Sequence, residues 1–155
     1  MKVDRGFEEL YRSEFHTVFR AVFALCGDAS VAEEATQEAF ARALARWRRL
    51  RDRPWAAGWV TTTAMNAARR SLRRRMVPPP PAGEERDVDA SVDLWRQVRV
   101  LPARQQEAVV LHYVMDLSVA DTAAVMRCES GTVKAHLARA RVALRTQLEE
   151  THDDR

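Results

Sequence analysis

The amino-acid sequence predicts an all-α protein made of two small helical domains, joined by a proline-rich, acidic linker. Apolar residues recur at spacings of three and four in both halves, which is typical of amphipathic helices. Alternating β-branched runs, which would indicate strands, are missing, and only 5 of the 155 residues are glycine. Four successive prolines from Pro78 to Pro81 cannot continue a helix and mark the linker. We expect this division: first domain 1–76, linker 77–91, second domain 92–150 and tail 151–155.

Composition and charge limit the class of protein. With 46% hydrophobic and 30% charged residues, the chain has enough apolar material to fold. No stretch approaches the ~18 uninterrupted apolar residues of a membrane span, and a start with Asp4, Glu8 and Glu9 is no signal peptide. We therefore expect a soluble, cytoplasmic protein that does not bind a membrane. Positive charge is concentrated in residues 1–77, which indicates either a nucleic-acid-binding surface or a solvated arginine-rich face.

The sequence carries no signal of an enzyme, a metal site or a cofactor. Phosphate-loop, HExxH and GxSxG motifs are missing, and the four histidines show no metal-ligand spacing. We expect His16 and His112 in helix packing or on the surface. Cys26 and Cys128 stand far apart without a CxxC pair, so we expect two buried thiols, with a redox switch between the domains as the alternative.

The first two elements are expected to be amphipathic helices. The first ends near Gly27, and its apolar stripe is expected to lie in the core. That stripe consists of Phe7, Leu10, Tyr11, Phe15, Val18, Phe19 and Val22. The second helix begins at Ser30, where Ser30 and Glu33 fit a capping box, and runs to about Trp47. Its interior residues are Val31, Ala35, Ala39, Phe40, Ala43 and Leu44, and its other face carries Glu34, Gln37, Glu38, Ala41 and Arg42.

The third helix is the most informative segment. It is expected to begin near Pro54, a favourable first-turn residue, and to extend as far as Arg75. At about 100° per residue, small apolar residues fall on one side. The opposite face collects Trp55, Trp59, Thr62, Thr63, Asn66, Arg69, Arg70, Arg73 and Arg74. Arginines bind phosphate and flat aromatics stack on unpaired bases, so this face favours single-stranded or melting DNA. The alternative is that the tryptophans are core residues and the arginines are solvated.

The second domain shows the pattern of a helix-turn-helix. A helix around Trp95 is followed by another that starts at Leu101. Ser118 is then expected to cap a short helix, with Asp121 three residues further on. A short helix, a tight turn and a long basic helix are typical of this DNA-binding motif.

The long last helix is expected to follow a break around Cys128, with Ser130 as its cap and residues 131–150 as its span. One narrow apolar stripe is expected to pack inward, formed by Val133, Leu137, Ala140, Leu144 and Leu148. The outward face has small residues at its centre and polar or basic flanks: Ala135, Ala138 and Val142, with Thr132, Lys134, His136, Arg139, Arg141 and Arg145. Such a face suits a recognition helix, and a generic basic surface helix is the alternative.

A family resemblance rests on segments that occur in one order on both sides of the linker. They are Ala32–Phe40, Trp59–Val60, Asn66, Leu72–Arg75, Leu101–Pro102, Leu117–Ser118, Gly131–Lys134 and Arg139–Arg141. In this order they resemble the extracytoplasmic-function (ECF) group of bacterial RNA polymerase sigma factors, within the sigma-70 family. The resemblance covers nearly the whole chain and implies sigma region 2 in the first domain and region 4 in the second.

The resemblance implies a role for each surface in transcription initiation. The second helix would bind the β′ clamp coiled coil of core polymerase through Glu34, Gln37, Glu38 and Arg42, with Phe40 in the core. The third helix would recognise and help melt the minus-ten element through Trp59, Thr62, Thr63, Asn66, Arg69, Arg70, Arg73 and Arg74, with Asn66 near a flipped base. The last helix would read the minus-thirty-five element through Ser130, Thr132, Lys134, Ala135, His136, Arg139 and Arg141.

Further partners also follow from the resemblance. The second domain would contact the polymerase β flap, and the acidic linker would thread through the RNA exit path. We also expect an anti-sigma protein that clamps both domains in the resting cell.

Some positions depart from the family pattern. Arg70 stands where an acidic residue is frequent, and Gln106 replaces a frequent arginine. Thr122 replaces an aliphatic residue, and Arg127 stands where glycine commonly precedes the cysteine. Two other classes are left as alternatives: a stand-alone helix-turn-helix repressor or activator with a dimerising or sensing first domain, and an adaptor that binds polymerase without DNA. A repressor would bind DNA alone, whereas a sigma factor requires core polymerase.

Overall fold

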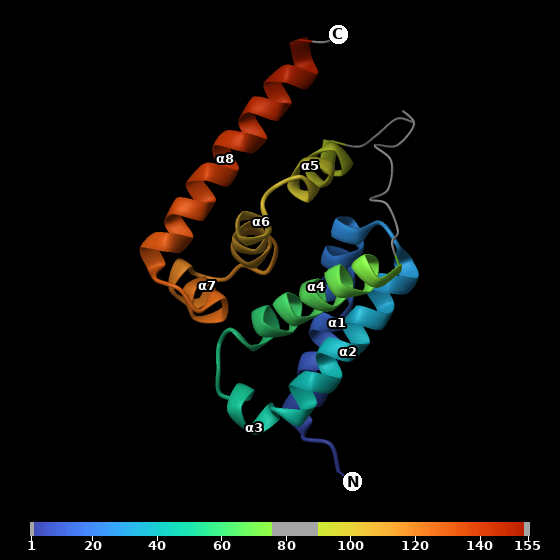
Figure 1. Ribbon diagram of the computed structural model, residues 1–155. Coiled ribbons are helices and arrows are strands. Elements are labelled where there is room, and N and C mark those ends of the chain that lie inside the picture. Colours follow the sequence, from blue (N-terminus) through green and yellow to red (C-terminus); the bar gives the residue numbers. More distant parts are fainter. Residues whose placement is uncertain (1, 76–89, 154–155) are drawn as a thin grey trace. The chain divides into compact units, whose positions relative to one another are not determined.

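The computed structural model describes the backbone of residues 2–75 and 90–153, and the side chains of residues 2–75 and 94–146. All regular elements in these stretches are helices, as predicted (Figure 1). The chain divides into two compact units, Met1–Pro80 and Pro81–Arg155. In the part of the chain that is described, no helix is both long and apolar enough to cross a membrane.

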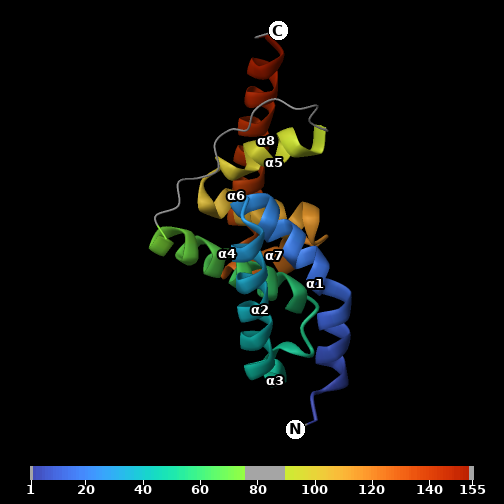
Figure 2. The same cartoon turned by 90° about the vertical axis from the view of Figure 1, so that its right-hand side faces the viewer.

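The first unit is a bundle of three long helices and one short helix. Its elements are α1 (Arg5–Cys26), α2 (Ala29–Ala45), α3 (Trp47–Leu50) and α4 (Ala56–Arg75). Helices α1, α2 and α4 pack against one another in pairs, and the two views show them side by side (Figures 1 and 2). The largest fully buried side chains between them are Val18, Val22, Val31, Thr36, Phe40, Val60 and Thr61.

The ends of α1 follow from local hydrogen bonds. The Asp4 carboxylate accepts a hydrogen bond from the Gly6 backbone N–H at 2.8 Å and caps the N-terminus. The neighbouring Trp47 side chain and the hydrogen bond from this N–H lower the pKa of Asp4 below its usual value. At the C-terminus Gly27 adopts φ 71°, a left-handed conformation that glycine tolerates without steric cost. The predicted end of the first helix is therefore confirmed.

The predicted cap of the second helix is wrong. Helix α2 begins at Ala29, and its cap is Asp28, whose Oδ1 accepts a hydrogen bond from the Val31 N–H at 3.0 Å. The left-handed turn at Gly27 is followed by extended backbone at Asp28, which places this carboxylate at the helix start. Ser30 already lies inside the helix.

Aromatic side chains fill one end of the first unit. Phe40 is 2% exposed, as expected from the resemblance, and its ring centroid lies 5.0 Å from that of Tyr11 and 5.7 Å from that of Phe15. Two residues expected in the core are instead exposed, Tyr11 at 40% and Leu44 at 38%, and Leu10, Phe15 and Phe19 are only half-buried. The Tyr11 ring packs on its neighbours while its outer part reaches solvent, and Leu44 lies one residue, about 100°, past the buried position Ala43.

The second unit contains α5 (Ala90–Arg99), α6 (Ala103–Val109), the π-helix η1 (Val110–Val114), α7 (Val119–Met126) and α8 (Ser130–Asp153). Helix α8 packs on α5, α6 and α7. Of the predicted inward stripe, Val133, Leu137 and Ala140 are buried and Leu144 is half-buried, whereas the side chain of Leu148 lies outside the described residues. The predicted linker over 77–91 is also outside them, except for its last two residues, which belong to α5.

The connection from α6 to α7 differs from a simple helix end. The backbone widens into η1, where the Met115 N–H donates to the Val110 carbonyl at 3.0 Å. Asp116 then takes a left-handed conformation with φ 55°. Ser118 caps α7 as predicted, because its hydroxyl oxygen accepts a hydrogen bond from the Asp121 N–H at 3.0 Å.

The turn between α7 and α8 is built on Arg127, which has φ 54° in a region that favours glycine. The Cys128 N–H then closes the end of α7 by donating to the Ala123 carbonyl at 3.1 Å. Ser130 is not a cap, because α8 already includes it and the capping position falls on Glu129. The same helix continues to Asp153, past its predicted end at residue 150.

The two cysteines differ in exposure. Cys26 is buried as expected, and its thiol donates to the Asp28 carbonyl at 3.3 Å. Cys128 is only half-buried, because it lies in the turn rather than on a packed helix face. Neither thiol takes part in a disulfide bond among the described residues.

Candidate nucleic-acid interface

Helix α4 has two distinct faces. Its inner residues Val60, Ala64, Ala67 and Ala68 are buried against α1 and α2. The side chains predicted to face outward all lie on the other side. Asn66, Arg70, Arg73 and Arg74 are exposed, while Trp55, Trp59, Thr62, Thr63 and Arg69 are half-buried. The structure therefore brings the amide, the guanidinium groups and Trp59 together on α4, with Trp55 in the turn just before it.

The threonine run does not break α4. The Thr61 hydroxyl donates to the Ala57 carbonyl and the Thr63 hydroxyl donates to the Trp59 carbonyl, each at 2.8 Å. These hydroxyls are thus satisfied by the helix's own backbone, four residues earlier. The hydroxyl oxygen of Thr62 is buried and has no protein partner within the described ranges. A hydroxyl of this kind can accept or donate a hydrogen bond to a ligand group that displaces neighbouring side chains.

Trp59 is the aromatic residue nearest the middle of this face. The guanidinium carbon of Arg46 lies 5.9 Å from the Trp59 ring centroid, within the range of a cation–π contact. Trp55 has a similar contact with Arg53, also at 5.9 Å. Both indoles are half-buried. They are therefore neither core residues, as one interpretation expected, nor a fully exposed stacking surface, as the other expected.

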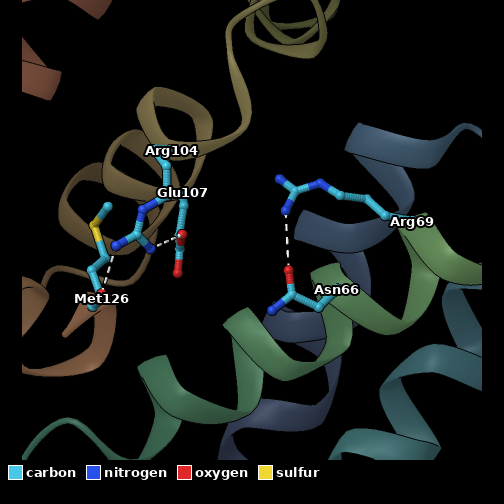
Figure 3. Close-up of polar contacts among 5 residues, drawn as sticks. All are labelled: Asn66, Arg69, Arg104, Glu107 and Met126. Carbon is cyan, nitrogen blue, oxygen red and sulfur yellow. Dashed lines mark hydrogen bonds and ion pairs between the residues drawn. The ribbon is translucent and has the colours of Figure 1, made fainter.

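Asn66 and Arg69 form a pair on the outward face of α4. The Arg69 Nη1 donates to the Asn66 Oδ1 at 3.2 Å, which fixes the amide with its NH₂ group turned away from the arginine (Figure 3). The next arginine on the same face, Arg73, donates from Nε to the Arg69 carbonyl at 3.4 Å. A free amide edge beside several guanidinium groups can bind a base and the phosphates next to it.

The acidic face of α2 adjoins this basic face. Arg42 donates to Glu38 at 2.7 Å, and Arg70 of α4 lies 3.8 Å from the same carboxylate. Arg75 of α4 donates to Glu34 at 3.1 Å. The fourth residue predicted on this face, Gln37, is exposed. Sequence reasoning missed these bridges, because the ion pairs between the helices join residues far apart in the chain.

The outward face of α8 is largely as predicted. Ser130, Thr132, Lys134, Arg139 and Arg141 are exposed. Ala135 and His136 are instead half-buried, and the His136 Nδ1 is a buried atom with no partner among the described side chains. Ala135 therefore lies at the edge of the outward face rather than at its centre. Val142, which is 63% exposed, continues this face.

A polar bridge holds α6 to the end of α7. The Arg104 Nη2 donates to the Met126 carbonyl at 2.7 Å, and its Nη1 donates to the Glu107 carboxylate at 2.9 Å (Figure 3). The Glu107 side chain is only 8% exposed, so the pairing with Arg104 compensates for the burial of its carboxylate. Gln106, the departure from the family's arginine, donates from Nε2 to the Val98 carbonyl at 3.1 Å and joins α5 to α6.

Sequence reasoning did not assign two residues of the second unit to the site, Tyr113 beside α8 and Arg104 between α6 and α7. The Tyr113 hydroxyl accepts a hydrogen bond from Arg141 at 2.8 Å. Arg104 acts at the α6–α7 junction, and its three-residue spacing from Glu107 was the available sequence signal. Within residues 2–75 and 94–146, no group of histidine, cysteine and carboxylate side chains could hold a metal ion.

Comparisons with known proteins match both units to regions of one protein family. Residues 10–76 match the family described as Sigma-70 region 2, and residues 91–144 match the family described as Sigma-70, region 4. The RNA polymerase sigma-E factor of Streptomyces antibioticus is 30% identical over 152 residues, covering 92% of this chain and 84% of that protein. The ECF RNA polymerase sigma factor SigC of Mycobacterium tuberculosis is 31% identical over 152 residues, covering 90% and 82%.

A solved structure shares the fold. The sigma factor RpoE of Bartonella quintana, determined in complex with the anti-sigma factor NepR, matches with a TM-score of 0.75. The match has 21% sequence identity and covers 94% of this chain and 98% of that chain.

Proposed function

This chain belongs to the ECF group of the sigma-70 family of RNA polymerase sigma factors, and we propose that it selects promoters through two DNA-binding faces and one polymerase-binding face. Members of this family are not enzymes. They are initiation factors that direct RNA polymerase to specific promoters. What remains to be assigned is the role of each surface.

The outward face of α4 recognises the minus-ten element and helps to melt it. The observation that carries this proposal is the grouping of Asn66, Trp59 and the arginines on one exposed side of a helix whose other side is buried. Asn66 presents its NH₂ group to an unpaired base, and Arg69, Arg70, Arg73 and Arg74 bind phosphates. Trp59, with Thr62 and Thr63 beside it, supplies a stacking surface.

The exposed face of α2 binds the β′ clamp coiled coil of core polymerase. Glu34, Gln37, Glu38 and Arg42 lie together on this face and offer charged and polar groups of both signs. Because Glu34 and Glu38 also pair with arginines of α4, the polymerase-binding face and the minus-ten face share a border.

The outward face of α8 reads the minus-thirty-five element in the major groove. Its exposed N-terminal residues, Thr132 and Lys134, lie where a recognition helix contacts base edges, with Ser130, Ala135 and His136 beside them. Arg139 and Arg141 follow on later turns and bind phosphates. The second unit also contacts the polymerase β flap, which holds it at the distance of the upstream element.

A protein that blocks these faces would keep the factor inactive, and we include an anti-sigma protein among its partners. The support is the exposure of functional faces on both units, which a free factor would present continuously. Pull-down from non-inducing cells should recover this partner, and recovery of polymerase alone would count against it.

Run-off transcription with bacterial core polymerase and a promoter library tests the function. The wild-type chain should initiate at discrete sites, while an Arg73→Ala/Arg74→Ala variant should lose promoter opening, because two phosphate-binding groups are removed. The matched control is Arg48→Ala/Arg49→Ala, which removes the same charge from two exposed arginines of α3 outside the proposed faces. If nothing initiates although the chain alone shifts duplex DNA, the repressor alternative replaces this proposal.

A further inference from the structure

Tyr113 joins two parts of the second unit that are distant in sequence. It lies in the π-helix η1, and its hydroxyl accepts a hydrogen bond from the Nη1 of Arg141 on α8 at 2.8 Å. The tyrosine is 51% exposed, so this contact lies at the surface rather than in the core. A surface hydrogen bond to a proposed phosphate-binding arginine bears on DNA binding more than on folding.

The backbone around Tyr113 is held on both sides. The widened turn of η1 is closed by the bond from the Met115 N–H to the Val110 carbonyl. The neighbouring His112 hydrogen-bonds through Nδ1 to the Leu117 carbonyl at 2.7 Å, and its ring lies edge-on to Tyr113 with centroids 4.9 Å apart. These contacts fix the position of Tyr113, so its hydroxyl lies next to α8.

The contact leaves Arg141 able to bind DNA. A guanidinium carries five N–H donors, and Tyr113 occupies one of them. The partner in the described part of the chain is a hydroxyl rather than a carboxylate, so the positive charge is not neutralised.

We propose that Tyr113 is a positioning residue for promoter binding, whose hydroxyl orients the Arg141 guanidinium toward a backbone phosphate beside the minus-thirty-five element. This inference rests on the proposed function of α8. An arginine that is already held loses less side-chain freedom when it binds than one that moves freely. Because phosphate contacts set affinity and register rather than base choice, Tyr113 acts on many promoter sequences alike.

The test is a double-mutant cycle on the complete holoenzyme. The promoter is one recovered from the library with the wild-type chain, and its dissociation constant is measured at several salt concentrations. Arg141→Ala should weaken binding and reduce the slope of log K against log salt by about 1. Tyr113→Phe should weaken binding about threefold to tenfold, and it should cost nothing further in the Arg141→Ala background.

Tyr11→Phe is the matched control. It removes the same atom from a similarly exposed tyrosine, outside every proposed binding face, and should leave promoter binding unchanged. Thermal unfolding shows whether each variant is folded. As a second variant, Arg141→Lys keeps the charge but lacks the planar fork, and it should reproduce the loss seen with Tyr113→Phe.

Each other outcome overturns the inference. Independent, additive effects of the two substitutions would show that Tyr113 does not act through Arg141. Unchanged promoter binding by Arg141→Ala would show that Arg141 does not contact a phosphate. Tighter binding by Tyr113→Phe would show that the hydroxyl keeps the arginine away from the DNA. Failure of the wild-type chain to initiate at any discrete site would instead refute the proposed function, before any variant is compared.

Discussion

Glu38 of α2 lies 2.7 Å from Arg42 and 3.8 Å from Arg70 of α4, so one carboxylate borders two groups with different proposed roles. Arg42 belongs to the proposed polymerase-binding face, and Arg70 to the proposed minus-ten face. The resemblance predicts an acidic residue at position 70, which would repel Glu38, whereas Arg70 of this chain pairs with it.

Reversing the charge at Arg70 should destabilise the first unit modestly. Arg70→Glu places two carboxylates across α2 and α4 and should cost about 0.5–1 kcal/mol of unfolding free energy at low salt, because both groups are partly solvated. Urea unfolding of the full chain at low and high salt measures this. The charge-swapped double variant Glu38→Arg/Arg70→Glu should regain part of the lost unfolding free energy. A loss of the same size at low and high salt would contradict a contribution from the ion pair.

Thr122→Val should stabilise the second unit by about 1 kcal/mol. The Thr122 side chain is fully buried, and its hydroxyl has no partner in the described structure, so its desolvation is uncompensated. Thr61→Val is the matched control, since that hydroxyl is also fully buried but donates to a backbone carbonyl. Thermal or urea unfolding should show a gain only for Thr122, and equal responses would argue against this explanation.

Arg127→Gly should also stabilise the second unit, by about 1 kcal/mol. Arg127 is held at φ 54°, where an L side chain is strained and glycine is not. Gly27→Ala is the opposite experiment at φ 71°, and it should cost a similar amount in the first unit. A rise in melting temperature for the first and a fall for the second would confirm that backbone conformation sets both effects.

Arg104→Ala should damage minus-thirty-five recognition without touching the α8 surface. The substitution leaves the nearly buried Glu107 carboxylate and the Met126 carbonyl without their partner, which should cost about 2 kcal/mol. The orientation of α7 would then be less well fixed. Promoters that depend on the upstream element should weaken most in transcription assays, while Arg48→Ala, at an exposed arginine of α3, should leave them unchanged.

The sequence was sufficient for the helical class and for the outward and inward faces of the long helices. The spacing that placed Asn66 and Arg73 outside, and Val60 inside, depends only on the helical period. The Ser118 cap was also predictable, because a cap and its N–H donor are neighbours in sequence. The cap at Asp28, by contrast, was missed in favour of Ser30, because it depends on the left-handed turn at Gly27.

Contacts between distant segments were beyond the reach of the sequence. Nothing in the spacing of Tyr113 and Arg141 predicts that their side chains meet, since this requires the widened turn of η1. The pairing of Glu34 with Arg75 likewise depends on how α2 crosses α4. Even the partial burial of Ala135 follows from how α8 packs on its neighbours rather than from its own pattern.

The self-contained hydrogen bonds of Thr61 and Thr63 have an evolutionary consequence. Because these hydroxyls bond to the backbone of their own helix, α4 keeps its shape without help from its solvent-facing side chains. Substitutions at exposed positions such as Asn66 or Arg73 can then accumulate with little penalty in folding. Paralogues built on the same scaffold are thereby free to diverge in the promoters they serve.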